Sequence, residues 1–108
     1  MMTDAENRKG SVQEQILQDA DAAFRVSARR NRLLAHWAAE QMVLTPEETA
    51  AYSKAVIQSD FEGAGDEDVI RMVLGDLVAA GCDVDQAGVR AALEEMTVEA
   101  RRQLMGES

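Results

Sequence analysis

The sequence has little of what cross-links or interrupts a chain: its 108 residues include one cysteine, one histidine and one proline. Because Cys82 has no second cysteine to pair with, an intrachain disulfide and a cysteine-based metal cluster are both excluded. A single unpaired thiol is typical of a reducing compartment such as the cytoplasm. The alternation of polar and β-branched residues that marks strands is also absent, and helical spacing takes its place. These absences predict an all-α protein.

Aromatic residues and long apolar runs are scarce as well. Aromatic residues make up 4% of the chain, so its core has to be built from aliphatic side chains, methionine and alanine. No stretch approaches the roughly 18 apolar residues that a membrane span needs, and no apolar signal region follows the N-terminus. Hydrophobic residues nevertheless account for 46% of the chain, which is typical of a folded domain. We therefore expect a single cytoplasmic domain without direct membrane insertion.

Positive charge is in deficit, since 11 basic residues oppose 20 acidic ones and give a net charge of −9. A surface of this sign repels a phosphate backbone. The composition therefore argues against nucleic acid as a partner and favours proteins or small ligands.

The first expected helix covers residues 12–42, because Ser11 and Glu14 form a capping box and Gly10 disfavours an earlier start. A helix of about 30 residues spans roughly 45 Å, which is long for a compact domain of this size. We therefore expect residues 1–10 to be a mobile tail and residues 11–106 to form one domain. Within that domain, residues 11–23 should project from the rest or be partly disordered.

Three further helices follow at about residues 46–62, 67–80 and 86–104. Thr45 and Glu48 form a second capping box, with Pro46 at the first helical position. Gly81 has the right place for a left-handed helix end, and Asp85 can cap the last helix. Connections this short make neighbouring helices antiparallel, so the expected architecture is a four-helix bundle with a long first helix.

The sequence lacks the residue types that a metal site or a catalytic site needs. His36 and Cys82 are too few for a zinc site, and nothing in the sequence brings them together as a nucleophilic pair. A calcium loop starting at Asp60 would place Arg71 where a bidentate glutamate is needed. We therefore predict no metal, no cofactor and no enzymatic activity.

The arginines of the first helix are a local reversal of sign. Arg25, Arg29 and Arg32 are spaced to share one helix face, and Arg30 lies beside them. One interpretation is that they pair with the protein's own acids, such as Asp21 one turn before Arg25. The other is an anion site for a carboxylate-rich partner or a phosphate-bearing ligand, including weak binding of adenine nucleotide. The sequence leaves both open.

Several short segments together resemble one protein family, the zeta subunit of the F-type ATP synthase of α-proteobacteria, long catalogued as a domain of unknown function. The similar segments are residues 24–25, 28–34, 37–40, 44–45, Tyr52, 60–62 and 65–69. The resemblance covers roughly residues 16–104. It implies a four-helix protein that binds the catalytic head of ATP synthase, formed by the α and β subunits around the central rotor, and inhibits ATP hydrolysis.

The resemblance also implies a mechanism. An N-terminal helical segment wedges into a catalytic α/β interface and blocks rotation in the hydrolysis direction, in a protein that is peripheral to the inner membrane when bound. The residues expected to make this contact are Val12, Ile16, Leu17, Asp19, Ala20, Ala23 and Phe24. The sequence departs from the family here, because the first ten residues lack an aromatic and Ile16-Leu17 replaces the usual aromatic pair. The alternative function is a binding module of the same fold for an anion or adenine nucleotide.

Overall fold

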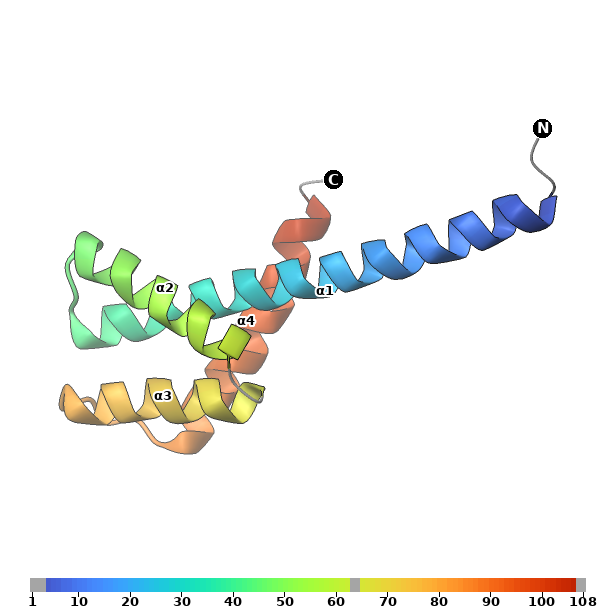
Figure 1. The fold of residues 1–108 in the computed structure, drawn as a ribbon. Coiled ribbons are helices and arrows are strands. Elements are labelled where there is room, and N and C mark those ends of the chain that lie inside the picture. The colour runs from blue at the N-terminus through green and yellow to red at the C-terminus, as the bar shows by residue number, and fades with distance from the viewer. Residues whose placement is uncertain (1–3, 63–64, 107–108) are drawn as a thin grey trace.

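The computed structural model describes the backbone of residues 4–62 and 65–106, and the side chains of residues 21–59 and 65–106. These residues form four helices and, within the described ranges, no strand: α1 (Asp4–Met42), α2 (Pro46–Glu62), α3 (Asp66–Ala79) and α4 (Gln86–Gly106). The expected all-α four-helix bundle is therefore confirmed. In Figure 1, α2 and α3 run beside the C-terminal half of α1, and α4 crosses it.

The predicted start of the first helix is wrong, because α1 begins at Asp4 instead of near Val12 and runs through Gly10 and Ser11 without a break. A glycine costs a helix about 1 kcal/mol but does not end it, and once a turn precedes Ser11 its backbone no longer needs a cap. Residues 1–3 lie outside the described residues, and the expected mobility of residues 1–10 stays a prediction.

Local hydrogen bonds account for the other helix boundaries, which fall close to their predicted positions. At the start of α2, the Thr45 amide donates to the Glu48 carboxylate at 2.9 Å, and the Glu48 amide donates to the Thr45 hydroxyl at 3.1 Å. This is the expected capping box, and it holds the pKa of Glu48 below its usual value because hydrogen bonds from Thr45 favour the carboxylate. At the start of α4, the Asp85 side chain accepts from the Gly88 amide at 2.8 Å.

The end of α3 needs a left-handed residue, and Gly81 supplies it with a φ of 82°. The amides of Gly81 and Cys82 donate to the carbonyls of Val78 and Leu77, at 3.0 and 2.9 Å. This pair of bonds defines a Schellman motif. The same motif ends α1, where the left-handed residue is Val43 with a φ of 57°.

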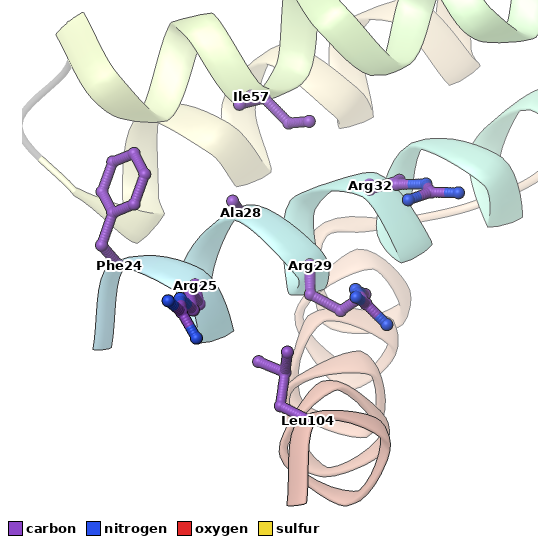
Figure 2. A pocket seen from close by; sticks show the side chains of 7 residues that line it. All are labelled: Phe24, Arg25, Ala28, Arg29, Arg32, Ile57 and Leu104. Carbon is purple, nitrogen blue, oxygen red and sulfur yellow. The ribbon is translucent and has the colours of Figure 1, made fainter. Parts of the chain in front are cut away.

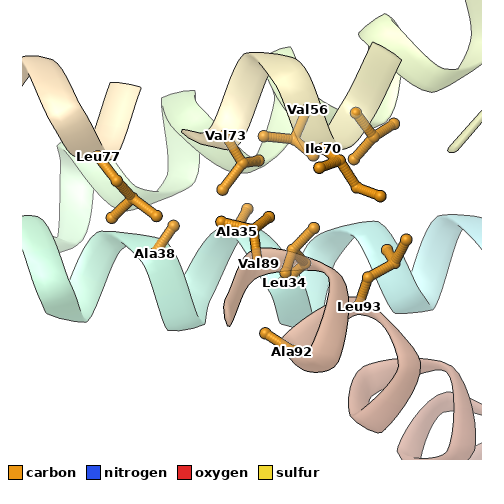
Figure 3. Packing of buried hydrophobic residues seen from close by; sticks show 11 residues of the cluster. Leu34, Ala35, Ala38, Val56, Ile70, Val73, Leu77, Val89, Ala92 and Leu93 are labelled. Atoms are coloured by element: carbon orange, nitrogen blue, oxygen red, sulfur yellow. The ribbon is translucent and has the colours of Figure 1, made fainter. Parts of the chain in front are cut away.

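The core lies where the C-terminal half of α1 meets the other three helices (Figure 3). On α1, Ala35 and Ala38 are small and let the neighbouring helices approach closely. The core residues are aliphatic and fully or almost fully buried: Leu34, Ala35, Ala38, Val56, Val69, Ile70, Val73, Leu77, Val89, Ala92 and Leu93. Tyr52 joins α2 to α3 by donating its hydroxyl to Asp76 at 2.9 Å. Partial burial and the neighbouring carboxylate together raise the pKa of Tyr52, so the phenol stays protonated as a donor.

The N-terminal half of α1 leaves this core and extends away from the bundle (Figure 1). The molecule measures 65 × 26 × 21 Å, and its radius of gyration is 17.7 Å. A compact domain of about 100 residues would have a radius of gyration near 13 Å. The difference arises because one helix is much longer than the bundle that holds its other end.

Candidate functional site

The helix α1 divides into a projecting part and a packed part. Among the residues of α1 whose side chains are described, 21–25 are all exposed, Val26 is the first that is partly buried, and Arg30 is the first that is buried. We call residues 4–23 the projecting segment; it is helical over a length of about 30 Å.

Most of the residues expected to contact a partner lie in the projecting segment. The backbones of Val12, Ile16, Leu17, Asp19 and Ala20 are part of α1, but their side chains lie outside the described residues. Ala23 is exposed, and Phe24, where α1 enters the bundle, exposes 56% of its surface.

Arg30 belongs to the packing of the bundle and is separated from the other three arginines. It is 8% exposed, its Nε donates to Asn31 Oδ1 at 3.1 Å, and its Nη1 lies 3.0 Å from Asp66 Oδ1. The interpretation as a residue that pairs with the protein's own acids therefore holds for Arg30. The structure places Arg30 away from the face shared by residues 25, 29 and 32, because position 30 turns into the bundle. Its predicted part in an anion site stays a prediction.

Arg25 also pairs with an internal acid, but in solvent. Its Nη2 lies 2.9 Å from Asp21 Oδ2, and both side chains are more than half exposed. An exposed pair of this kind contributes between about 0 and 1 kcal/mol, because water screens it. Arg25 can therefore exchange Asp21 for another anion at little cost.

Arg29 and Arg32 differ in the contacts that they make. Arg29 Nη1 donates to Gln103 Oε1 on α4 at 3.0 Å, which holds the guanidinium in place through a neutral amide. The amide has only one orientation here, because Gln103 Nε2 donates to Glu99 Oε1 at 3.1 Å and a carboxylate can only accept. Arg32 is exposed and makes no hydrogen bond or ion pair with another residue in the described part of the chain.

The three arginines line an open groove on the surface of α1 (Figure 2). Ile57 of α2 borders it on one side and Leu104 of α4 on the other, with Ala28 between them. This hollow has a volume of about 470 Å³, and a second of about 490 Å³ adjoins it and shares Arg29 and Arg32. We call the two together the basic groove; its lining is Phe24, Arg25, Ala28, Arg29, Arg32, Leu33, His36, Ile57, Gln103 and Leu104.

Glu99 on α4 lies beside Gln103, which lines the basic groove. The Glu99 carboxylate accepts hydrogen bonds from Arg102 and from Gln103. These bonds lower the pKa of Glu99 to about 2, and those from Arg102 have the larger effect. The carboxylate is therefore ionised but matched by a guanidinium. The groove combines guanidinium groups with the apolar surfaces of Phe24, Ile57 and Leu104, and suits a ligand with both anionic and apolar groups.

Sequence reasoning identified the arginines but not the residues that complete the groove. Ile57, Gln103 and Leu104 come from α2 and α4, and only the packing of these helices brings them beside α1. His36 was considered with Cys82, and the structure shows different surroundings for the two. His36 lines the basic groove, while the Cys82 thiol donates to the carbonyl of Gln41 at 3.3 Å.

The described residues contain neither a metal-binding cluster nor a membrane span. No group of three or more His, Cys, Asp or Glu side chains among them is arranged to hold a metal ion. None of the helices, over the described ranges, is long and apolar enough to cross a membrane.

Comparison with known proteins finds a matching family and similar solved structures. The model of a family described as ATPase inhibitor subunit zeta matches residues 2–103, nearly the whole chain. A protein structure solved by solution NMR is 44% identical in sequence and superposes with a TM-score of 0.68, over 79% of this chain and 96% of that one. No curated protein matches the chain. The family match and the structural match thus each cover most of the chain.

Proposed function

The chain belongs to the ATPase inhibitor subunit zeta family, and we propose that it binds the catalytic head of F-type ATP synthase and blocks the rotation that accompanies ATP hydrolysis. In this proposal the projecting segment of α1 enters an interface between the α and β subunits and stops the central rotor. The protein acts by binding and not by catalysis. It works in the cytoplasm and becomes peripheral to the inner membrane when it is bound to the enzyme.

The observation that carries this proposal is the projecting segment itself. A helix that extends about 30 Å beyond its own bundle can enter a groove between two subunits while the bundle stays outside. The C-terminal part of α1 is held in place, because from Arg30 onward it packs against α2, α3 and α4. A stiff rod with a fixed base is suited to obstruct a turning shaft.

The contact is proposed to involve one face of the projecting segment. Val12, Ile16 and Ala20 recur every four residues, so they share a face of α1. Ala23 and Phe24 continue that face to the edge of the bundle, while Leu17 and Asp19 flank it. The proposed contact is therefore an apolar stripe in a hydrophobic groove, bordered by charge.

The test compares the full chain with a variant lacking residues 2–20, using the catalytic head and inverted membranes from the same organism. The full chain should lower ATP hydrolysis by the head and leave ATP synthesis by energised membranes unchanged, because only the hydrolysis direction is blocked. The shortened variant should fold, as judged by circular dichroism, and should not inhibit. Unchanged hydrolysis at saturating full-length protein would remove the proposal, and equal inhibition of both directions would remove the directional mechanism.

A second candidate function, low-affinity binding of adenine nucleotide or another anion, is supported by the basic groove. Its arginines could pair with phosphate oxygens, and Phe24, Ile57 and Leu104 could accept an apolar base. A titration with ATP and ADP followed by NMR should then shift the signals of Arg29 and Arg32, and Arg32→Glu should abolish the shifts. Flat spectra at millimolar nucleotide would exclude this function.

A further inference from the structure

We propose that the outward face of α4 is a self-association surface, on which two copies of this chain pair their α4 helices in antiparallel directions. We call the exposed side of α4 from Ala91 to Met105 the α4 face, and Val98 lies at its centre. The inference goes beyond the proposed function and does not depend on it, because the contact involves neither the projecting segment nor another protein.

The centre of the α4 face is an apolar stripe that is open to solvent. Val98 exposes 67% of its surface and Met105 exposes 76%, and Ala91 is also exposed. The three residues follow each other at intervals of seven, which is the spacing of a seam between paired helices, and they span about 21 Å. The buried residues Val89 and Ala100 lie on the opposite side of α4, so the stripe points away from the core.

Charged residues flank the stripe in a pattern that complements itself. Two glutamates, Glu94 and Glu95, lie one turn before Val98, and two arginines, Arg101 and Arg102, lie one turn after it. In an antiparallel pair centred on Val98 of both copies, residues at similar distances on opposite sides of the centre meet. Each Glu94 then faces Arg101 of the second copy on one side of the stripe. On the other side, each Glu95 faces Arg102 of the second copy.

Charge and size both favour the antiparallel direction. A parallel pair would bring the glutamates of one copy against the glutamates of the other, and arginines against arginines, so like charges would meet. The antiparallel pair brings opposite charges together. It also places the small Ala91 opposite the large Met105 of the second copy, while Val98 meets its own equivalent, so the two apolar stripes fit each other.

The charges of the α4 face are available for this contact and balance one another. Glu94, Glu95 and Arg101 make no ion pair with another residue in the described part of the chain. Arg102 pairs with Glu99 on its own helix, and 69% of the Arg102 side chain is exposed. The chain as a whole carries a net charge of −9, so two copies repel each other over most of their surfaces. A face on which two glutamates match two arginines is where they can meet.

A contact made by one pair of helices is smaller than the roughly 1,600 Å² that stable complexes bury, so the dimer should be weak. Sedimentation velocity of the full chain from about 10 µM to about 1 mM should show a reversible shift from monomer to dimer, with a dissociation constant on the order of 100 µM. The salt concentration is about 0.15 M, because charges more than about 8 Å apart are then screened and the overall repulsion is reduced. A chain that stays monomeric at the highest concentration would overturn the inference.

Val98 is tested against a second exposed valine. Val98→Glu would bring two carboxylates together at the centre of the contact, so association should weaken at least about tenfold. Val78→Glu is the matched control, because Val78 is 58% exposed on α3 and lies outside the α4 face. This control should associate within about twofold of the original protein. Circular dichroism checks that both variants are folded, and equal association of Val98→Glu and the original protein would overturn the inference in favour of another surface.

A charge exchange tests the antiparallel register. Glu94→Arg alone and Arg101→Glu alone would each place like charges across the contact, so each variant should associate at least about tenfold more weakly than the original protein. An equimolar mixture of the two variants restores opposite charges at both positions and should associate within about threefold of the original. Both variants stay net acidic, so a general attraction between them does not produce this result. A mixture that associates no better than its components would overturn the antiparallel pairing.

Discussion

Arg30 Nη1 lies 3.0 Å from Asp66 Oδ1, and this pair joins α1 to the first residue of α3 at the point where α1 enters the bundle. Arg30 is buried, while the Asp66 side chain remains 56% exposed. The guanidinium also donates from Nε to Asn31, which is itself 1% exposed. One side chain thus satisfies a buried polar neighbour and holds two helices together.

Replacing Arg30 by lysine should lower the free energy of unfolding by about 1–2 kcal/mol, measured by urea denaturation. A lysine keeps the charge but cannot donate in two fixed directions, so it loses either Asn31 or Asp66. The matched control is Arg101→Lys on the exposed surface of α4, which should change stability by less than about 0.5 kcal/mol. Equal stability of the original protein and Arg30→Lys would show that the pair is dispensable.

The two Schellman motifs predict that glycine is favoured at the left-handed position of each. Val43 occupies the left-handed position at the end of α1 with a φ of 57°, although a β-branched residue is strained there. Its side chain is 87% exposed, so Val43→Gly should lose little packing and raise the thermal stability by about 1 kcal/mol.

At the second motif, Gly81→Ala should cost about 1 kcal/mol in the same thermal unfolding measurement. An added Cβ would meet nothing within 4 Å, so only the φ of 82° opposes it. A loss of stability in Val43→Gly would instead show that the valine side chain packs productively.

The capping box of α2 predicts a dependence on pH. Hydrogen bonds from Thr45 lower the pKa of Glu48 from its usual 4.5, so the folded state binds the proton more weakly than the unfolded state. The resulting stabilisation is present above pH 4.5 and is lost as the pH falls through the lower pKa of the folded state.

Glu48→Gln should therefore be less stable than the original protein at neutral pH, and the difference should shrink in acid. Thermal unfolding at a series of pH values measures the difference, and an NMR titration of the Glu48 carboxyl measures the pKa itself. A difference that is constant from neutral to acidic pH would contradict the assignment of the carboxylate as the capping group.

Gly10 offers a test of the projecting segment that leaves the bundle untouched. A helix without tertiary contacts depends on its own propensity, and alanine is favoured over glycine by about 1 kcal/mol. Gly10→Ala should increase helicity in far-UV circular dichroism and strengthen inhibition of ATP hydrolysis up to about fivefold.

Gly10→Pro is the matched opposite, because proline disrupts a helix interior by about 3 kcal/mol. It should weaken inhibition at least about tenfold without changing the thermal unfolding of the bundle. Identical inhibition by both variants would mean that a continuous helix at this point is not needed.

Local chemistry allowed the sequence to predict most helix boundaries. The Thr45–Glu48 box, the Asp85 cap and Gly81 each act on backbone groups within a few residues, so their effect does not depend on distant parts of the chain. The start of α1 was missed because a capping motif and a glycine are weak local preferences, which the residues before them can override.

The sequence by itself determined the helical class, the positions of most helix ends, and a cluster of arginines that needed explaining. Which of these arginines line the basic groove was decided by the tertiary structure alone. Packing directs Arg30 inward to Asp66, and it places Ile57 of α2 and Gln103 of α4 beside Arg29 and Arg32. The reason is that a helix fixes only the relative angles of its own side chains, whereas the neighbouring helices decide which of those angles are buried, paired or left open to a ligand.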